Sequence, residues 1–409
     1  MSALDAAAAP LPASEAERRR GLNGLLVYTF FMVTGFAMLM PLVAVHFVDR
    51  LGLAAAAVGA ALALRQVAQQ GLALIGGVLA DRYGARRMIC LGVLLRALGF
   101  ASLAYATQLR WLMLAMLLAA LGGALFEAPY QASIAALTDE RSRPRYYALS
   151  NWIGGAATTL GPLLGVALLR YDFALVCLSA AACFAANFVI AARLLPRVPA
   201  PARPPPLRDG LQRVWRNRPF LILVGLLMLY WFVAVQINLS LPLLAQRLTG
   251  SADSVGVMFA LSAGLTLALQ YVLVRWLQRW LSSAQMLVLG TTLMALAIGA
   301  FALVGSFAAF LACVAAFAIG AVLTRPSQQT LIADLADPQA LGSFLGVSSL
   351  SLAVGGGLGS LAGGGLLDLA AALRLPWLPW ATFCAVGLLG ALGLAWATRG
   401  AARAPATSP

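Results

Sequence analysis

The sequence Gly122-Gly123-Ala124-Leu125-Phe126-Glu127-Ala128-Pro129-Tyr130-Gln131 lies inside an apolar segment over residues 111–137, and an altered copy of it occupies residues 320–328. A shift of 197 residues aligns Gly123 with Gly320 and Pro129 with Pro326. An apolar segment of this length crosses a bilayer, because about 20 helical residues span the hydrocarbon. The repeat therefore predicts two similar membrane-embedded halves.

The chain as a whole has the composition of a polytopic membrane protein. It is 62% hydrophobic and only 10% charged, where soluble chains carry about 25% charged residues. We predict an all-α membrane protein with twelve transmembrane helices in two pseudo-symmetric six-helix bundles, which are parallel repeats because six is even. The predicted spans lie near residues 24–47, 53–80, 88–107, 111–137, 146–169, 173–195, 219–246, 254–275, 284–305, 308–332, 342–367 and 376–398.

The spans and the proline-rich interruption between them define the expected domains. These are a disordered cytoplasmic arm (1–20), an N-terminal bundle (21–195), a cytoplasmic linker (196–218), a C-terminal bundle (219–398) and a cytoplasmic tail (399–409). Within the linker, one helical face carries Leu207, Leu211, Val214 and Trp215, which predicts a short helix on the membrane surface. A linker disordered throughout is the alternative, given its prolines.

The net charge of +14 reflects membrane topology rather than nucleic-acid binding. All 28 basic residues are arginines. Twenty lie in the N-terminal arm, the even-numbered loops and the tail, against five on the other side. Because basic residues concentrate in cytoplasmic loops, both termini are expected in the cytoplasm.

Residue types that carry enzymatic chemistry are sparse. The five cysteines all lie in spans without ligand spacing, and His46 is the single histidine. A metal site needs several such ligands, and the sequence contains neither a nucleophile–base constellation nor a phosphate-binding loop. We expect no metal, no cofactor and no enzymatic activity.

Four charged residues are predicted inside the hydrocarbon, namely Glu127, Arg65, Arg96 and Arg325. A charge at that depth costs about 2.5–3.5 kcal/mol on insertion scales, so such residues are functional by default and have partners. Glu127 is the only such carboxylate, and its repeat counterpart is Thr324. One hypothesis makes Glu127 a proton carrier, since burial favours the neutral acid and a nearby arginine the carboxylate. The alternative is a fixed ion pair with an arginine.

The second predicted helix carries an unusual polar group, Arg65, Gln66, Gln69 and Gln70. Their spacing places three of them on one helical face, which must contact protein or water. They either line a cavity or join this helix to the fourth and eleventh helices, and glutamines commonly form such interhelical hydrogen bonds.

Two glycine-containing motifs mark places where the chain is expected to move. Residues 77–87, GVLADRYGARR, form a charged turn in which Gly84 permits a tight bend. Residues 161–165, GPLLG, form a glycine-rich face in the fifth helix.

With these motifs, the chain resembles the major facilitator superfamily. Residues 77–87 match the family's G-x-L-A-D-R-x-G-[RK]-[RK] signature except at Ala85, and residues 161–165 resemble its antiporter signature. HFVDRLG (46–52) and GGALFEAP (122–129) are similar to a multidrug-resistance branch of the drug/proton antiporters. The arginine that many such antiporters carry in the fourth helix is replaced by Leu118 or Ala119.

The resemblance implies a proton-driven multidrug efflux antiporter, hence antibiotic resistance, working by alternating access in a bacterial inner membrane. We expect a monomer that exchanges an amphipathic small molecule for H+. A proton-coupled importer of a metabolite and a non-transporting membrane sensor are the alternatives.

The roles that follow fall into three groups. The proton-coupling residues are Glu127, Arg325, Arg65 and Arg96. The gating residues are Gly77, Asp81, Arg82, Gly84, Arg86, Arg87, Gly161, Pro162 and Gly165, with Asp81 expected at the N-terminus of the eleventh helix when the cytoplasmic side is shut. The substrate-binding candidates, on the first, fourth and seventh helices, are Phe36, Met40, Phe126, Tyr130, Tyr230, Trp231, Gln236 and Asn238; core or lipid-facing packing is the alternative for each.

Overall fold

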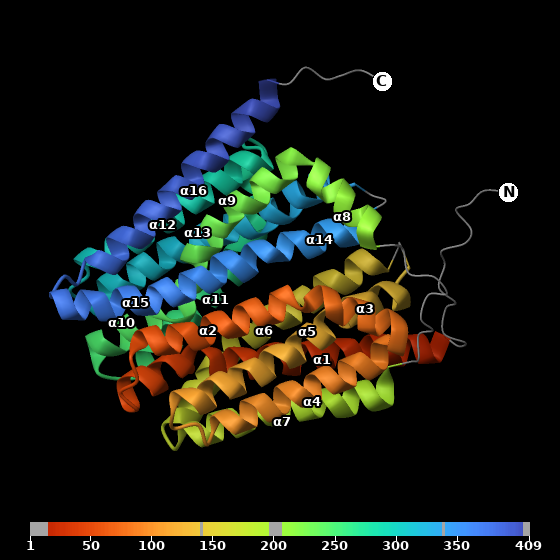
Figure 1. Cartoon of the computed structure of the whole chain (residues 1–409), viewed down its shortest axis with the longest axis horizontal. Helices are drawn as coiled ribbons and strands as arrows, with labels where there is room; N and C mark the ends of the chain where they lie inside the picture. The colour runs from red at the N-terminus through yellow and green to blue at the C-terminus, as the bar shows by residue number, and fades with distance from the viewer. Residues whose placement is uncertain (1–14, 140–141, 196–206, 338–339, 404–409) are drawn as a thin grey trace. The chain divides into compact units, whose positions relative to one another are not determined.

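The protein is helical throughout the described residues, 15–139, 142–195, 207–337 and 340–403 of a computed structural model (Figure 1). These residues contain no strand. Two compact units are present: unit 1 comprises Met1–Leu42 and Leu64–Pro205, and unit 2 comprises Val43–Ala63 and Pro206–Pro409. Unit 2 thus includes the end of the first span and the start of the second.

The first half of the chain forms seven α-helices and a π-helical turn. Helix α1 continues directly into π-helix η1, and the single residue Leu72 separates α2 from α3. The bounds are α1 Glu15–Ala44, η1 Val45–Arg50, α2 Ala55–Gly71, α3 Ala73–Tyr83, α4 Ala85–Leu103, α5 Leu109–Leu137, α6 Arg143–Leu169 and α7 Phe173–Leu194. Helix α4 packs along α5 and α7.

The second half repeats this plan after a short helix that lies in the linker. Its bounds are α8 Leu207–Arg216, α9 Arg218–Ala234, η2 Val235–Asn238, α10 Ser240–Thr249, α11 Asp253–Leu277, α12 Ser283–Ala300, η3 Phe301–Leu303, α13 Phe307–Leu335, α14 Leu341–Leu350, η5 Ser351–Gly356, α15 Gly357–Leu373 and α16 Leu378–Arg403. Helix α12 packs along α13 and α16, as α4 does along α5 and α7.

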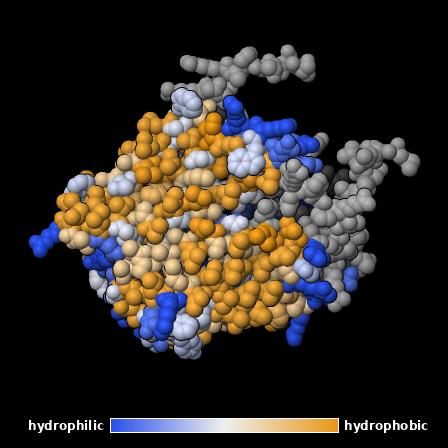
Figure 2. Space-filling view, viewed as in Figure 1, coloured by the Kyte–Doolittle hydropathy of each residue, from blue (hydrophilic) through white to orange (hydrophobic). Residues whose placement is uncertain are grey.

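Ten segments within the described residues are long and apolar enough to cross a membrane. Two of the twelve predicted spans are not among them. The span predicted at 53–80 is divided at Leu72 into α2 and α3, and α4 carries Arg86, Arg87 and Arg96 within 19 residues. Figure 2 shows hydrophobic residues covering most of the visible surface, with hydrophilic residues toward its margins.

The ends of the chain are more helical than the sequence indicates. Helix α1 begins at Glu15, inside the arm expected to be disordered, and α16 continues to Arg403, inside the expected tail. Arg18 of this extension forms a 3.0 Å ion pair with Asp139 in the loop after α5, which gives the extra helical turn a partner. Residues 1–14, 196–206 and 404–409 lie outside the described part.

The short linker helix is confirmed as α8. Val214 is buried and Trp215 is 68% exposed, so these two residues, which were predicted to share one face, differ in exposure. A place for this helix on the membrane surface stays a prediction. Arg213 forms a 2.7 Å ion pair with Asp337, and Gly210 packs against Ser343 at the start of α14.

Candidate functional site

The site forms around Glu127, a half-buried residue about two-thirds of the way along α5 in unit 1. Two glycines one turn earlier create the space that the neighbouring polar side chains fill. A Cβ atom on Gly123 would clash with the Arg96 guanidinium and lie 2.7 Å from Cδ of Gln69. A Cβ atom on Gly122 would lie 2.6 Å from the backbone nitrogen of Arg96, so α4 and α5 touch along their backbones. The Gly-Gly pair therefore admits a buried arginine and a glutamine beside the acid.

Gln69 of α2 is the centre of the polar network. Its Nε2 donates a 3.0 Å hydrogen bond to Oε2 of Glu127. Its Oε1 accepts a 3.2 Å hydrogen bond from Arg65 and a short one from Arg96. One amide thus connects two cations to one carboxylate, and uses its donor and its acceptor for groups of opposite charge.

Both arginines are buried, and each contacts aromatic rings in addition to its hydrogen bonds. Arg65 is 8% exposed and Arg96 is 4% exposed. Arg65 also donates to Gln66, and Arg96 Nε donates to the carbonyl of Ala119. The Arg96 guanidinium lies 5.0–6.0 Å from the ring centroids of Phe36, Phe100, Phe126 and Phe184. Such cation–π contacts stabilise a desolvated guanidinium by about 2 kcal/mol.

The balance of charge in this network is uneven. Two guanidinium groups face one carboxylate, and within the described part of unit 1 neither arginine forms a direct ion pair with Glu127. The Nε of Arg65 is buried without a hydrogen-bond partner. A second anion or a hydrogen-bond acceptor would therefore be favoured beside Arg65, whose guanidinium stacks at 5.3 Å on Phe36. Phe36 is half-buried and borders this network.

Of the predicted proton-coupling residues, the structure brings three together. Glu127, Arg65 and Arg96 meet through Gln69, so the expectation that the helix 2 glutamines join helices is confirmed for Gln69. A direct, fixed ion pair between Glu127 and Arg65 or Arg96 is not what the structure contains. Arg325 lies on α13 in unit 2, exposed, and makes no ion pair or hydrogen bond with the described residues of that unit.

Most of the substrate-binding candidates of unit 1 are buried and pack against neighbouring side chains. Met40, Phe126 and Tyr130 are 2–4% exposed. The Tyr130 hydroxyl lies 2.5 Å from Oγ1 of Thr29, and its ring stacks on Tyr28 at 5.1 Å. Phe36 is the one that keeps an accessible surface next to buried charge. The contacts of Tyr28 and Thr29 with Tyr130 were not predicted, because a tyrosine and a threonine in an apolar span give no periodic signal in the sequence.

The candidates of unit 2 form a neutral cluster. Tyr230 is buried and accepts a 3.2 Å hydrogen bond from Thr324, the repeat counterpart of Glu127. Gln236 is fully buried, and its amide donates to the Gly359 carbonyl at 2.9 Å and accepts from Ser240 at 2.7 Å. Trp231 and Asn238 are half-buried. The Trp231 indole nitrogen is buried without a partner, so it is a free donor in this cluster.

The gating candidates occupy a turn and a helix contact. Gly84 joins α3 to α4 with φ of 91°, a backbone angle that favours glycine. The Arg82 guanidinium lies 5.5 Å from the Tyr83 ring, Arg86 donates to the Ala192 carbonyl, and Arg87 is exposed. Asp81 lies in the last turn of α3, and its side chain is outside the described part.

The other gating candidates stand along α3 and α6. A Cβ atom on Gly77 would lie 3.8 Å from that of Ala128 in α5. Pro162 lies inside α6. A Cβ atom on Gly161 would lie 2.7 Å from that of Ala37, and one on Gly165 would clash with the Met38 carbonyl. These two glycines therefore set the closest approach of α6 to α1.

A carboxylate that the sequence did not single out as a site holds the start of α2 within unit 2. Asp368 of α15 accepts hydrogen bonds from the backbone N–H groups of Ala55 and Ala56, at 3.1 and 2.8 Å. Helix N-termini present such unpaired donors and favour an anion. Gly59 and Gly364 allow the two helices to touch there. The repeat counterpart, Asp172, instead caps its own helix α7 through Ala174.

Near the same end of unit 2, Arg247 of α10 lies 3.6 Å from Asp49 of η1. Among the described residues no group of three or more histidine, cysteine, aspartate or glutamate side chains is placed to hold a metal ion.

Comparison with known proteins identifies the family. The Major Facilitator Superfamily model matches residues 25–248 and 229–409. The multidrug resistance protein MdtH of Edwardsiella ictaluri (strain 93-146) is 40% identical over 379 residues, covering 93% of this chain and 94% of that protein. MdtH of Photorhabdus laumondii is also 40% identical, and the match covers 91% of this chain and 93% of that protein.

Solved structures share the fold at low sequence identity. A peptide transporter POT in complex with sulfate matches with a TM-score of 0.79 at 15% identity, covering 98% of each chain. The nucleoside transporter NupG matches with a TM-score of 0.75 at 14% identity, covering 92% of this chain and 99% of that one. The chain therefore belongs to the major facilitator superfamily, and it is a multi-pass membrane transporter with the twelve-helix, two-bundle fold rather than an enzyme.

Proposed function

We propose that the protein is a proton-driven exporter of amphipathic drugs that works by alternating access. The relatives that are 40% identical over more than nine-tenths of their length carry the name multidrug resistance protein. The observation that carries the proposal is the buried connection of Glu127 to two arginines through Gln69.

In this proposal Glu127 is the proton carrier. As a carboxylate it accepts from Gln69 and offsets part of the charge of Arg65 and Arg96 across one amide. When it takes up a proton, the two arginines lose their only nearby anion, and an electron-rich or anionic group of another molecule becomes the favoured partner. When the proton leaves, the carboxylate again favours cationic groups. Protonation thereby changes which ligands the site favours, which is what coupling requires.

The substrate surface that we propose is centred on Phe36. This ring lies between the arginine network and accessible space, and aromatic surfaces accommodate chemically varied ligands. Trp231, with its free indole donor, is the corresponding candidate in unit 2. Phe126, Tyr130, Tyr230 and Gln236 support these positions rather than contact substrate, because their polar atoms or rings already have partners.

Alternating access requires contacts that form and break at both ends of the helices. The Asp368 contact with the start of α2 is of this kind, since one carboxylate there holds two backbone N–H groups that water can satisfy when the contact opens. We propose that it opens and closes during transport, with Asp81 acting at the opposite end.

The proposal extends to location and coupling ion. The 20-to-5 distribution of arginines supports cytoplasmic termini in a bacterial inner membrane. We propose H+ as the coupling ion, because the carboxylate of Glu127 can take up and release a proton beside the arginine network. One chain carries the whole network, so we propose that the monomer transports.

Inside-out membrane vesicles test direction and coupling together. An exporter accumulates a fluorescent lipophilic cation on energisation and releases protons from the vesicle interior when substrate is added. Uptake by whole cells without accumulation in inside-out vesicles would instead establish the importer. Reconstituted protein that binds the dye and never moves it would establish the sensor.

A further inference from the structure

An exposed arginine of unit 2 takes no part in the network around Glu127. Arg325 lies on α13, which ends at Leu335, about 15 Å further along at 1.5 Å per residue. Helix α13 has 29 residues and so exceeds the hydrocarbon thickness of about 30 Å by a few residues at each end. Arg325 therefore lies inside the hydrocarbon, where an exposed charge must face water or a partner rather than lipid.

The helical face that starts at Arg325 is polar. Gln328 and Gln329 follow three and four positions later, and residues at this spacing share one face of a helix. Arg325 and Gln329 are exposed and Gln328 is half-buried, whereas the exposed residues of α13 before Arg325 are alanines. Polar residues in membrane-spanning helices face the interior of a bundle or a water-filled cavity. This face of α13 therefore borders water.

The residue before Arg325 is fixed by packing, while the Arg325 side chain itself is exposed. Thr324 is buried, and its hydroxyl donates a 3.2 Å hydrogen bond to Tyr230 of α9. Arg325 makes no hydrogen bond or ion pair with the described residues of unit 2. A packed backbone thus presents a guanidinium group whose five N–H donors are unused by the described residues of this unit.

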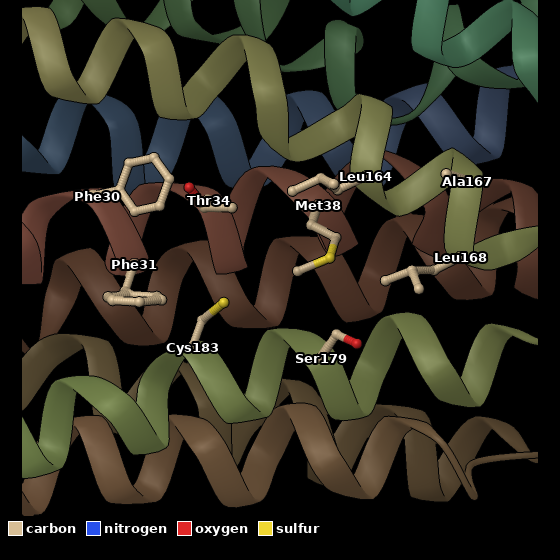
Figure 3. Close-up of a pocket in the computed structure, with 9 residues that line it drawn as sticks. All are labelled: Phe30, Phe31, Thr34, Met38, Leu164, Ala167, Leu168, Ser179 and Cys183. Carbon is tan, nitrogen blue, oxygen red and sulfur yellow. The ribbon is translucent and has the colours of Figure 1, made fainter.

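The described residues of unit 1 present their charges differently. Arg65 and Arg96 are 4–8% exposed and already bond to Gln69. The hollow between α1, α6 and α7 has a volume of about 330 Å³, and none of the side chains that line it is charged (Figure 3). Of the three arginines predicted inside the hydrocarbon, Arg325 is thus the one that a dissolved anion can reach.

We propose that Arg325 binds the carboxylate of an amphipathic substrate and so selects acid-bearing substrates over their neutral or cationic counterparts. The planar guanidinium matches a carboxylate through two parallel hydrogen bonds. The amides of Gln328 and Gln329 supply further donors on the same helical face. That the acid belongs to a transported molecule rests on the proposed export, whereas the contact itself does not.

Two dyes that differ only in the acid group test this contact. Rhodamine 110 carries a carboxylate on a cationic ring system, and rhodamine 123 is its methyl ester. Binding of each dye to the purified full-length protein is measured by fluorescence polarisation in detergent, without transport. We expect the parent to bind rhodamine 110 about tenfold more tightly than rhodamine 123, because only the acid can pair with Arg325.

Substitutions of the arginine identify the residue that makes the contact. Arg325→Gln should lower the affinity for rhodamine 110 about ten- to hundredfold and leave that for rhodamine 123 unchanged, which also shows that the variant folds. Arg325→Lys keeps the charge without the planar fork and should give an intermediate affinity for the acid. Arg275→Gln, which removes an exposed arginine that bonds to Tyr271 in α11, is the matched control and should bind both dyes as the parent does.

Three results overturn the inference: a parent that binds neither dye, an Arg325→Gln variant that keeps its affinity for rhodamine 110, and an equal loss of both dyes in that variant. Accumulation in inside-out vesicles separates the contact from the proposed function. A parent that prefers rhodamine 110 in detergent but accumulates neither dye would contradict export and leave the Arg325 contact in place. A parent that accumulates rhodamine 123 but binds both dyes equally would support export and overturn the contact.

Discussion

The Nε2 atom of Gln69 donates a 3.0 Å hydrogen bond to Oε2 of Glu127, while the Oε1 atom of the same amide accepts from Arg65 and Arg96. The Glu127 carboxylate and the guanidinium groups of Arg65 and Arg96 are thereby separated by one side chain instead of forming direct ion pairs. This arrangement leaves Glu127 connected to cations but not fixed by them, which suits a residue that must exchange a proton.

Removing the Gln69 amide should disable the network. Gln69→Leu removes one hydrogen bond from each of Glu127, Arg65 and Arg96, although Arg65 keeps its bond to Gln66 and Arg96 its bond to the Ala119 carbonyl. A buried polar group left unsatisfied costs about 1–3 kcal/mol. We expect a thermal unfolding midpoint lowered by several degrees and transport reduced to a few per cent of the parent or less. Gln70→Leu, at the half-buried next position, is the matched control. Equal transport by both variants would show that the amide is dispensable.

A carboxylate at position 69 should change the pH dependence rather than the fold. Gln69→Glu provides an anion for the arginines but places a second acid beside Glu127, and like charges favour protonation. The midpoint of the pH–transport profile is expected to move to higher pH by about one unit. The profile is measured in proteoliposomes at fixed membrane potential, and an unmoved midpoint would separate Glu127 from the titrating step.

The glycine before the acid should be intolerant of a methyl group. Gly123→Ala places a Cβ atom against the Arg96 guanidinium and the Gln69 side chain, so we expect destabilisation by about 1–3 kcal/mol through overpacking and a loss of transport. Gly264→Ala, where a Cβ atom meets open space in α11, should be neutral or stabilising by up to about 1 kcal/mol, since alanine favours helix. Detergent-solubilised unfolding measures both.

The contact between Asp368 and the start of α2 should control local opening there. Asp368→Ala removes the acceptor for the Ala55 and Ala56 N–H groups. Hydrogen bonds to a charged group are worth about 1.5–3 kcal/mol, so deuterium uptake in a peptide covering residues 53–60 should accelerate roughly ten- to hundredfold. Asp172→Ala, which removes only the cap of α7, should leave that peptide unchanged. Equal uptake in both variants would refute the assignment.

Asp139 offers a control for proton coupling. Hydrogen bonds from Ser142, together with Arg18, lower the pKa of this exposed carboxyl from 3.8 to about 2. Its stabilising effect is therefore complete above pH 4 and is lost only as pH falls through 2, so Asp139 stays ionised across pH 5–8. Asp139→Asn should keep the shape of the pH–transport profile in that range. A profile altered as in Glu127 variants would mean that any lost carboxylate has this effect.

Much of the architecture was predictable because it depends on composition and repetition. The apolar segments predicted the spans, and the recurrence of Gly123 and Pro129 as Gly320 and Pro326 predicted the two halves. The break at Leu72 was not predictable, since the span reads as continuous there. The start of α1 at Glu15 was also not predicted, because the charged residues there read as a disordered segment. The ion pair of Arg18 with Asp139, which stabilises this turn, cannot be read from the sequence.

The site was predictable in its members but not in its connections. Buried charge identified Glu127, Arg65 and Arg96, because intramembrane charge is costly wherever it occurs. Spacing along one helix could not show that Gln69 contacts all three, since that depends on how α2, α4 and α5 approach one another. Nor could it show that Asp368 caps a helix over 300 positions away in sequence.

The most direct test of the account is substrate-induced proton release by Glu127→Gln in inside-out vesicles, compared with the parent and Asp139→Asn. We predict that Glu127→Gln still binds a fluorescent amphiphile but releases no protons and does not accumulate it against a gradient, while Asp139→Asn behaves like the parent. Normal proton release by Glu127→Gln would contradict the assignment of the proton to this residue.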